Sequence, residues 1–221
     1  SYTPKRETST EWNEGDVIYL RFYQADEKTV VCGKAVYNAS SSLWNISYYG
    51  NLSTGSTLKC EAFYFVNATA TDNYHVTMTP MSCAYVDEAA TYIVDDSELF
   101  VSAVLAPKTA RMHIKGEKDK TVAVSGVVYN TSFSLTDNVF TSSTEEISTQ
   151  FESDGYTPYI YCSLDETHVI TLDDLYYKYT KTFDPTKFMA GESGYMVMPS
   201  QVENKGWTCL LLSRRGRGFG A

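Results

Sequence analysis

One short segment of the chain, GESGY at residues 191–195, has a serine between glycines, as many catalytic loops do. The nucleophile elbow of α/β-hydrolases needs Gly-x-Ser-x-Gly, and Tyr195 stands where the last glycine belongs. Trypsin-like proteases carry a related Gly-Asp-Ser-Gly-Gly segment, but their serine needs a histidine from an Ala-Ala-His-Cys motif, which this sequence lacks. We therefore interpret the segment as a glycine-rich turn ahead of a strand.

Histidines and cysteines, which serve as bases, nucleophiles and metal ligands, are scattered along the chain. Each histidine lies in or beside a strand with a polar face, so we interpret all three as solvated: His75, His113 and His168. No two cysteines form a Cys-x-x-Cys pair, which argues against a zinc site or a redox dithiol, and their odd number does not indicate a disulfide framework. Three of them lie in alternating runs, where a thiol acts as a small apolar group, and we expect these to be free and buried: Cys32, Cys60 and Cys162. The other two are Cys83 and Cys209.

Neighbouring acidic residues occur as four pairs: Asp87-Glu88, Asp95-Asp96, Asp165-Glu166 and Asp173-Asp174. Glycoside hydrolysis needs two carboxylates that face each other across a cleft, and calcium needs several converging oxygens, usually spaced as Asp-x-Asp-x-Asp-Gly. Neither spacing occurs here, so we assign the pairs to turns and strand ends. The sequence indicates no catalytic, cofactor-binding or metal-ligating residue, and we expect a protein that is not an enzyme.

Composition narrows the class of protein and of partner. Of the 221 residues, 43% are hydrophobic and 14% are aromatic, which is typical of a globular chain that buries a core. The formal charge of −9 disfavours nucleic acid and anionic lipid by repulsion, so we expect no nucleic-acid partner. The one basic cluster, SRRGRGFG at residues 213–220, is interpreted as a solvated tail. No apolar run reaches the roughly 18 residues of a membrane-spanning helix.

Strands are the elements that would position any site, because hydrophobic and polar residues alternate along most of the chain. In the opening segment EWNEGDVIYLRF, Gly15 and Asp16 are expected to turn the chain into the sheet, and Trp12 can cap the end of the sandwich. The residues on one side of this strand are Ile18, Leu20 and Phe22. Those on the other side are Val17, Tyr19 and Arg21. Further strands are expected at residues 29–37, 43–49, 58–66 and 75–81.

The segment LAPKTA at residues 105–110 is the best candidate for a domain boundary, because Pro107 follows an apolar stretch and a new alternating series begins at Arg111. Just before it, a short helical turn capped by Asp95 to Ser97 is favoured over a loop that enters a strand. In the strand at 111–116, alternation buries two residues and exposes Arg111, His113 and Lys115. Later strands are expected at 121–129, 133–135, 146–151, 158–164, 168–172, 175–183, 194–199 and 207–213. Strands so spaced, with turn signals between them, indicate β-sandwiches.

Three consecutive segments resemble the start of the fimbrillin-like proteins of Bacteroidetes: EWNEGDVIYLRF, the hairpin VVCGKAVYNASSSLW and GNLSTGSTLKCEAFYFVNA. Chains of that family often show a tryptophan, then Gly-Asp, then an alternating strand. A second strand, a strand with a tryptophan and an apolar strand that ends near Asn-Ala come next. The downstream half, from ARMHIKG to LYYKYTKTFDPTKFMAGESGYMVMP, looks like the second sandwich of the family.

The resemblance implies an all-β fold of two tandem Greek-key β-sandwich domains, transthyretin-like or immunoglobulin-like, which we place at residues 1–106 and 107–221. It also implies an exported lipoprotein on the cell surface, held at the outer membrane by a lipid anchor outside this chain. The polar start SYTPKRETSTEW would suit a tether left after an export signal is removed. Some relatives polymerise into fimbriae, or pili, by adding a strand to an open sheet edge, and others are tip or anchor subunits.

We therefore expect a non-enzymatic cell-surface adhesin or fimbrial subunit, whose partners are other fimbrial subunits or ligands on host or bacterial surfaces. Its working surface is expected at sheet edges and loops, above all in residues 1–12 and 207–213. A second hypothesis is a carbohydrate-binding module of a glycan-capture system, with aromatic platforms for sugar rings: Trp44, Tyr48, Tyr49, Tyr176 and Tyr179. A third is a hydrolase with an unfamiliar site.

Overall fold

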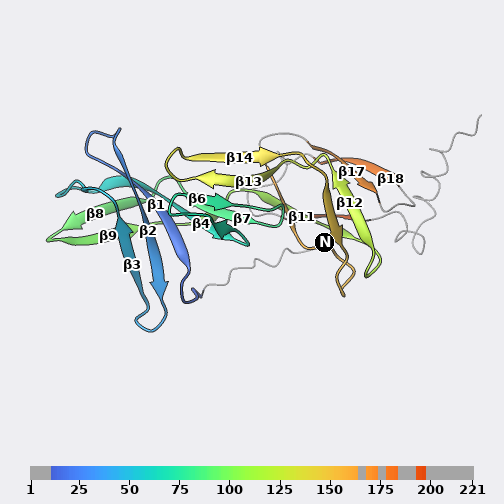
Figure 1. The fold of residues 1–221 in the computed structure, drawn as a ribbon, viewed down its shortest axis with the longest axis horizontal. Helices are drawn as coiled ribbons and strands as arrows, with labels where there is room; N and C mark the ends of the chain where they lie inside the picture. The colour runs from blue at the N-terminus through green and yellow to red at the C-terminus, as the bar shows by residue number, and fades with distance from the viewer. Residues whose placement is uncertain (1–10, 164–167, 174–177, 184–192, 198–221) are drawn as a thin grey trace, which may run out of the picture. The chain divides into compact units, whose positions relative to one another are not determined.

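Strands make up the regular structure of this chain. The computed structural model describes residues 11–163, 168–173, 178–183 and 193–197, and within these ranges it contains no helix (Figure 1). The expected all-β class is confirmed. In this described part, accordingly, no helix is long and apolar enough to cross a membrane.

The strands group into two compact units. Among the described residues, the first unit comprises those up to Lys108 together with Asn130–Thr141, and the second comprises Thr109–Tyr129 and those from Ser142 onward. The chain thus leaves the first unit, returns to it for one hairpin, and leaves it again. The sequence-based boundary after residue 106 places this hairpin in the C-terminal part of the chain, whereas its contacts group it with the N-terminal part.

One large antiparallel sheet forms the centre of the first unit, with the strand order β10-β7-β4-β1-β2-β3. β1 and β2 form the expected hairpin, in a register that begins with Val17 opposite Val36. β4 follows β1 on the other side, with Leu20 opposite Ala62. The strands of this sheet are β1 (Val17–Tyr23), β2 (Val30–Asn38), β3 (Leu43–Tyr48), β4 (Leu58–Val66), β7 (Cys83–Asp87) and β10 (Ala106–Pro107).

A second hairpin, β8 (Thr91–Asp95) and β9 (Glu98–Ser102), is attached to the start of β4, where Leu58 lies opposite Tyr92. The helical turn favoured from the sequence in this region is wrong. Asp96 and Ser97 adopt φ values of 45° and 71°, and two successive positive values are what a tight two-residue hairpin turn requires. The β-branched and aromatic residues that flank this turn favour strands over a helix.

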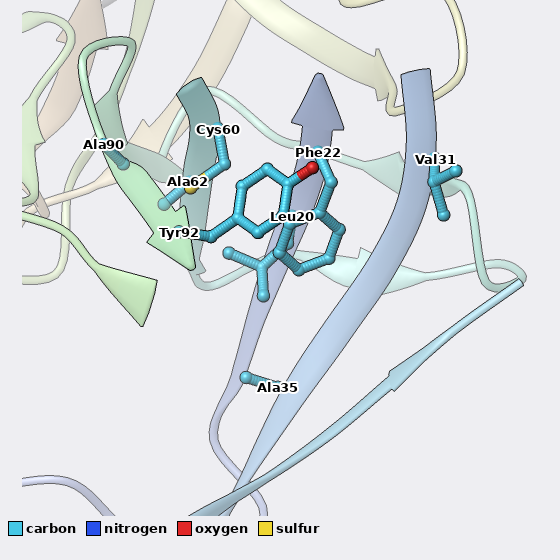
Figure 2. Close-up of a cluster of buried hydrophobic side chains, with 8 residues drawn as sticks. All are labelled: Leu20, Phe22, Val31, Ala35, Cys60, Ala62, Ala90 and Tyr92. Carbon is cyan, nitrogen blue, oxygen red and sulfur yellow. The ribbon is translucent and has the colours of Figure 1, made fainter. Parts of the chain in front are cut away.

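The β8–β9 hairpin covers one face of the large sheet. Figure 2 shows Tyr92 of β8 lying against Leu20 and Phe22 of β1, and the rings of Phe22 and Tyr92 meet edge to face at 5.0 Å. The Tyr92 hydroxyl donates a hydrogen bond of 2.8 Å to the backbone carbonyl of Tyr23, so its polar end is satisfied. The grouping of Leu20 and Phe22 on one side of the first strand is confirmed.

The opposite face of the large sheet is covered by a four-stranded sheet with the order β14-β13-β6-β5. Its strands are β5 (Thr69–Ala70), β6 (His75–Thr77), β13 (Tyr129–Ser134) and β14 (Val139–Ser143). Phe63 and Phe133 pack between the two layers with ring centroids 4.6 Å apart. Because both faces of β1 are covered, Tyr19 and Arg21 are buried on one side of the strand, as Leu20 and Phe22 are on the other.

Two further sheets form the described part of the second unit, with the orders β16-β11-β19 and β15-β12-β17-β18. β11 and β19 run parallel, and the other strand pairs described in this unit are antiparallel. The strand expected at 121–129 ends at Ser125, because Gly126 turns the chain with a φ of 84°. The strands are β11 (Ala110–Lys115), β12 (Thr121–Ser125), β15 (Ile147–Gln150), β16 (Ile160–Cys162), β17 (His168–Asp173), β18 (Lys178–Phe183) and β19 (Ser193–Val197).

Replacing Gly126 by alanine is expected to destabilise the second unit by at least about 3 kcal/mol. The left-handed conformation alone disfavours alanine by about 1–2 kcal/mol, and an added Cβ would lie 2.0 Å from the backbone oxygen of Val169. Urea denaturation measures the loss. Gly155→Ala is the matched control, because its φ is 79° and the nearest atom to its Cβ would be 3.2 Å away. Equal losses in the two variants would contradict the steric argument.

Candidate functional site

An apolar groove of about 400 Å³ opens on the first unit. The large sheet contributes one wall, which consists of Ile18, Leu20, Ala35, Trp44 and Ile46. β9 and the residues after it contribute the other, which consists of Val101, Ala103 and Leu105. Trp12, ahead of β1, completes the lining. No lining side chain is ionisable, so the groove offers no acid, base or nucleophile and suits an apolar ligand.

The alternation of side chains along β1, β2 and β3 decides which residues of the large sheet face the groove. In β3, Trp44 and Ile46 are half-buried toward the groove, whereas Leu43 and Asn45 are exposed. In β1 and β2, Ile18 and Ala35 lie opposite each other. Figure 2 shows Ala35 along β2 and away from the Phe22–Tyr92 contact, at the part of the sheet that lines the groove. The groove is thus a part of this core face that remains open.

Trp12 is held at the groove by the turn that precedes β1. The Asp16 carboxylate accepts a hydrogen bond of 2.7 Å from the backbone N–H of Asn13, and Gly15 takes the φ of 82° that this turn needs. The backbone N–H of Gly15 donates to the carbonyl of Tyr37 at 3.0 Å, which fixes the turn to the end of β2. The turn expected at Gly15 and Asp16 is confirmed.

Aromatic rings pack around Trp12. It meets Trp44 edge to face at 4.9 Å and Tyr64 at 5.1 Å, and Tyr37 lies 5.1 Å from Trp44. The Tyr64 hydroxyl donates to Asp16 at 3.3 Å, and burial, then the nearby Asp16 charge, raises the pKa of Tyr64. Tyr64 therefore stays a neutral donor. The cluster forms a stiff, largely apolar end to the groove.

Both strands beside the groove are sheet edges. Among the described strands, β3 pairs with β2 alone and β9 pairs with β8 alone. The outward N–H and C=O groups of each edge therefore have no ladder partner in this part of the chain. Large apolar side chains are exposed along the same edges, with Leu43 64% exposed on β3 and Phe100 54% exposed on β9. Open edges combined with exposed apolar residues are typical of a surface that takes up another strand.

Cys32, Cys60 and Cys162 are free thiols, as expected. Cys60 and Cys162 are fully buried, and burial raises the pKa of each thiol to about 12, so neither is a nucleophile near neutral pH. Cys32 is only half-buried, not buried as expected; it lies on the face of β2 opposite to Val31 and Ala35, where it packs against the edge of the cluster that contains Phe63 and Phe133. Burial, partly offset by the Arg21 charge, raises its pKa too.

The acidic pairs that the structure describes serve turns, as expected. Asp87 accepts hydrogen bonds from the backbone N–H groups of Ala89 and Val104, and Asp95 and Asp96 lie at the β8–β9 turn. Among the described residues, no three His, Cys, Asp or Glu side chains lie together as a metal site would require. Several candidates lie outside the described residues: Cys209, Asp165-Glu166, Asp174, Tyr176, and residues 1–10, 191–192 and 207–213. Ser193 lies in β19, and the side chains of Ser193, His168 and Tyr179 also lie outside the description.

His113 and Arg111 on β11 are not the water-exposed residues that alternation predicts. The imidazole of His113 is stacked on Tyr156 at 4.4 Å and on Tyr159 at 4.6 Å. Arg111 is 8% exposed, and its guanidinium lies 4.2 Å from the centre of the Tyr159 ring. The rings of Tyr156 and Tyr159, which precede β16 in the chain, cover this face of β11. The alternation of residues within β11 cannot reveal this cover. His75 is exposed, as expected, and hydrogen-bonded to Asp72 at 2.8 Å.

Acidification is expected to lower the stability of the second unit through His113. Burial and, to a lesser degree, the Arg111 charge lower its pKa, while Asp154 acts in the opposite direction. The unfolded chain therefore takes up this proton first, so the free energy of unfolding falls as the pH drops below about 6.5. Urea denaturation at about pH 7.5 and about pH 5.5 measures this loss. His113→Gln should show a smaller loss, and an unchanged pH dependence would contradict the assignment.

Comparisons of the chain with models of protein families, with curated proteins and with solved structures found no match.

Proposed function

We propose that this chain is a non-enzymatic surface subunit, an adhesin or fimbrial protein, that takes an apolar β-strand of a neighbouring subunit into the groove of its first unit. The observation that supports this most is the groove itself, which is apolar and flanked by the open edges of β3 and β9. A strand laid along one of these edges gains backbone hydrogen bonds and places every second side chain in the groove.

The proposal also includes a fold and a location in the cell. We propose that the chain folds as two tandem Greek-key sandwich domains. We also propose that the protein is exported and held at the outer membrane by a lipid anchor outside this chain. The proposed occupant of the groove is the segment WTCLLLS, residues 207–213, of another copy. Its alternate residues Trp207, Cys209 and Leu211 are apolar, as the groove lining is.

Filling the groove is expected to abolish strand uptake. Ala103 lines the groove and has an exposed small side chain, so Ala103→Trp places a large ring where the incoming strand would lie. A labelled peptide of residues 205–215 is added to the full chain, and binding is followed by fluorescence anisotropy. The affinity should fall by at least about tenfold, the equivalent of about 1.4 kcal/mol, and polymers of the full chain should be lost.

Val104→Trp is the matched control for this experiment. Val104 is the next residue, is 82% exposed and does not line the groove. Its replacement adds the same ring to the same segment and should leave binding and assembly unchanged. Equal binding by the two variants would show that the groove is not the acceptor, and the proposal would lose its main support.

Carbohydrate binding is the second candidate, and an aromatic patch formed by Tyr49 and Tyr74 beside β2 favours it. Tyr49 is 67% exposed and lies 6.3 Å from Tyr74, beside Lys34, whose ammonium is hydrogen-bonded to Asn73 at 3.0 Å. Such rings pack on the apolar face of a sugar while the neighbouring polar groups bind its hydroxyls. A glycan array tests this, and specific binding that is lost in Tyr49→Ala but kept in Ala103→Trp would favour a glycan-binding module.

A further inference from the structure

A hairpin from the middle of the chain completes the first unit. Segment 130–141 belongs to this unit, although the residues before and after it belong to the second. Figure 1 shows its strands β13 and β14 beside β6. We define the surface that holds it as the hairpin receptor, which comprises the edge of β6 together with Arg21, Glu61 and Phe63.

Backbone hydrogen bonds tie the hairpin to the receptor along the length of β6. β13 and β6 are antiparallel, with three aligned residue pairs. Beyond one end of this ladder, the N–H of Met78 donates to the carbonyl of Thr131 at 2.7 Å. Beyond the other end, the N–H of Leu135 donates to the carbonyl of Tyr74, also at 2.7 Å. The contact is therefore a strand addition in which the hairpin is the added element.

Apolar side chains of the hairpin fill the space under this added strand. Phe133 and Leu135 are each 1% exposed, and the Phe133 ring lies 4.6 Å from Phe63 and 5.4 Å from Phe65. Both belong to the hydrophobic cluster of this face, so the layer is incomplete without the hairpin.

Two buried charges recognise the turn of the hairpin. The Arg21 guanidinium donates to the backbone carbonyls of Leu135 and Thr136, the latter at 2.6 Å, and also pairs with Glu61 at 3.0 Å. Glu61 accepts a further bond of 3.2 Å from the side-chain amide of Asn138. Arg21 and Glu61 are only 7% and 4% exposed, so the bonds that they make to the hairpin turn meet a part of their hydrogen-bonding capacity that water cannot easily meet.

We propose that the hairpin receptor also accepts segment 130–141 of a second copy of this chain, so that two chains exchange hairpins and form a dimer. Each contact described above is made by residues of the hairpin, and a second copy supplies the same residues in the same register. The chain must change direction on both sides of the hairpin for this exchange. Gly126, at a φ of 84°, lies just before it, and the polar segment 142–146 follows it. This dimer does not depend on the groove or its proposed function.

Two cysteine variants of the full chain test the exchange. Thr77→Cys lies on β6 and Ser132→Cys lies opposite it on β13, at a position between hydrogen-bonded pairs. The Cα atoms of such a pair are about 4.5 Å apart, which a disulfide can bridge. The two variants are unfolded in urea, mixed, refolded together at rising chain concentration and oxidised. We expect a disulfide-linked dimer on a non-reducing gel, in an amount that rises with concentration.

The controls separate exchange from random cross-linking. Val139→Cys lies on β14 of the same hairpin, is 51% exposed and does not face β6. Its mixture with Thr77→Cys therefore measures the disulfide-linked dimer that forms by random collision of two chains. The wild-type chain, treated in the same way, shows how much disulfide-linked dimer forms through the native cysteines. A chain carrying both Thr77→Cys and Ser132→Cys should form the disulfide internally at low concentration. The proposal is overturned if the mixed dimer is no more abundant than with Val139→Cys, or if that internal disulfide does not form.

Discussion

Glu61→Ala is expected to lower the free energy of unfolding of the first unit by about 3–5 kcal/mol, because it leaves the Arg21 guanidinium buried without its counter-charge. The two side chains are joined at 3.0 Å and lie between the large sheet and the β13–β14 hairpin. Glu61 also accepts hydrogen bonds from Tyr23 and Asn138, which the variant would leave without this acceptor. Urea denaturation in a Trp207→Phe background, in which Trp12 and Trp44 are the remaining tryptophans, measures the loss in this unit by fluorescence.

Lys59→Ala is the control for the Glu61 experiment. Lys59 also pairs with Glu61, at 3.4 Å, but its side chain is 53% exposed. Water screens this pair, so its removal should change the free energy of unfolding by about 1 kcal/mol or less. A loss in Lys59→Ala as large as that in Glu61→Ala would contradict the difference between a buried and an exposed ion pair on which the prediction depends.

Features that depend only on residues close together in the sequence were predictable from it. The turn at Gly15 and Asp16 and the hairpin of β1 and β2 follow from turn residues and alternation within a stretch of about 20 residues. The same local reasoning fails at β8 and β9. Asp and Ser are good helix caps, but they also tolerate positive φ, and only the pairing of the flanking strands decides between the two.

The burial of Arg21 could not be predicted from its own strand. One of the two carbonyls that it binds belongs to Leu135, 114 residues away in sequence. One signal was nonetheless present, because the side of β1 that carries Arg21 also carries Val17 and Tyr19, and apolar residues on both sides of a strand indicate cover on both faces. An arginine among such residues indicates a buried, paired charge.

Half of the groove was recognisable from the sequence. Trp12 and Trp44 are prominent in the opening strands, and their faces follow from alternation. The opposite wall comes from Val101 and Ala103, in a region for which a helical turn was favoured. A helix would have pointed these residues in other directions, so the groove appears only when β9 is known to be an edge strand.

Phe133→Ala is expected to destabilise the first unit by about 3–5 kcal/mol, because it removes a fully buried aromatic ring that the hairpin contributes and leaves a cavity between the layers. Phe133 contacts the rings of Phe63, Phe65 and Phe140 at 4.5–5.4 Å. Val139→Ala, on the same hairpin but half-exposed, should cost about 0.5 kcal/mol or less. Similar losses in the two variants would mean that the hairpin lies on the surface instead of closing the core.

The double variant Glu61→Ala/Phe133→Ala separates local from cooperative effects. Glu61 lies on β4 and Phe133 on β13, but both hold the same hairpin, Glu61 through Asn138 and Arg21 and Phe133 through the apolar layer. If either single variant loosens the whole hairpin, the second substitution removes contacts that are already lost. The loss in the double variant should then fall short of the sum of the single losses by more than about 0.5 kcal/mol, which is the usual limit for independent sites. Strict additivity would show that the charged turn and the apolar strand dock separately.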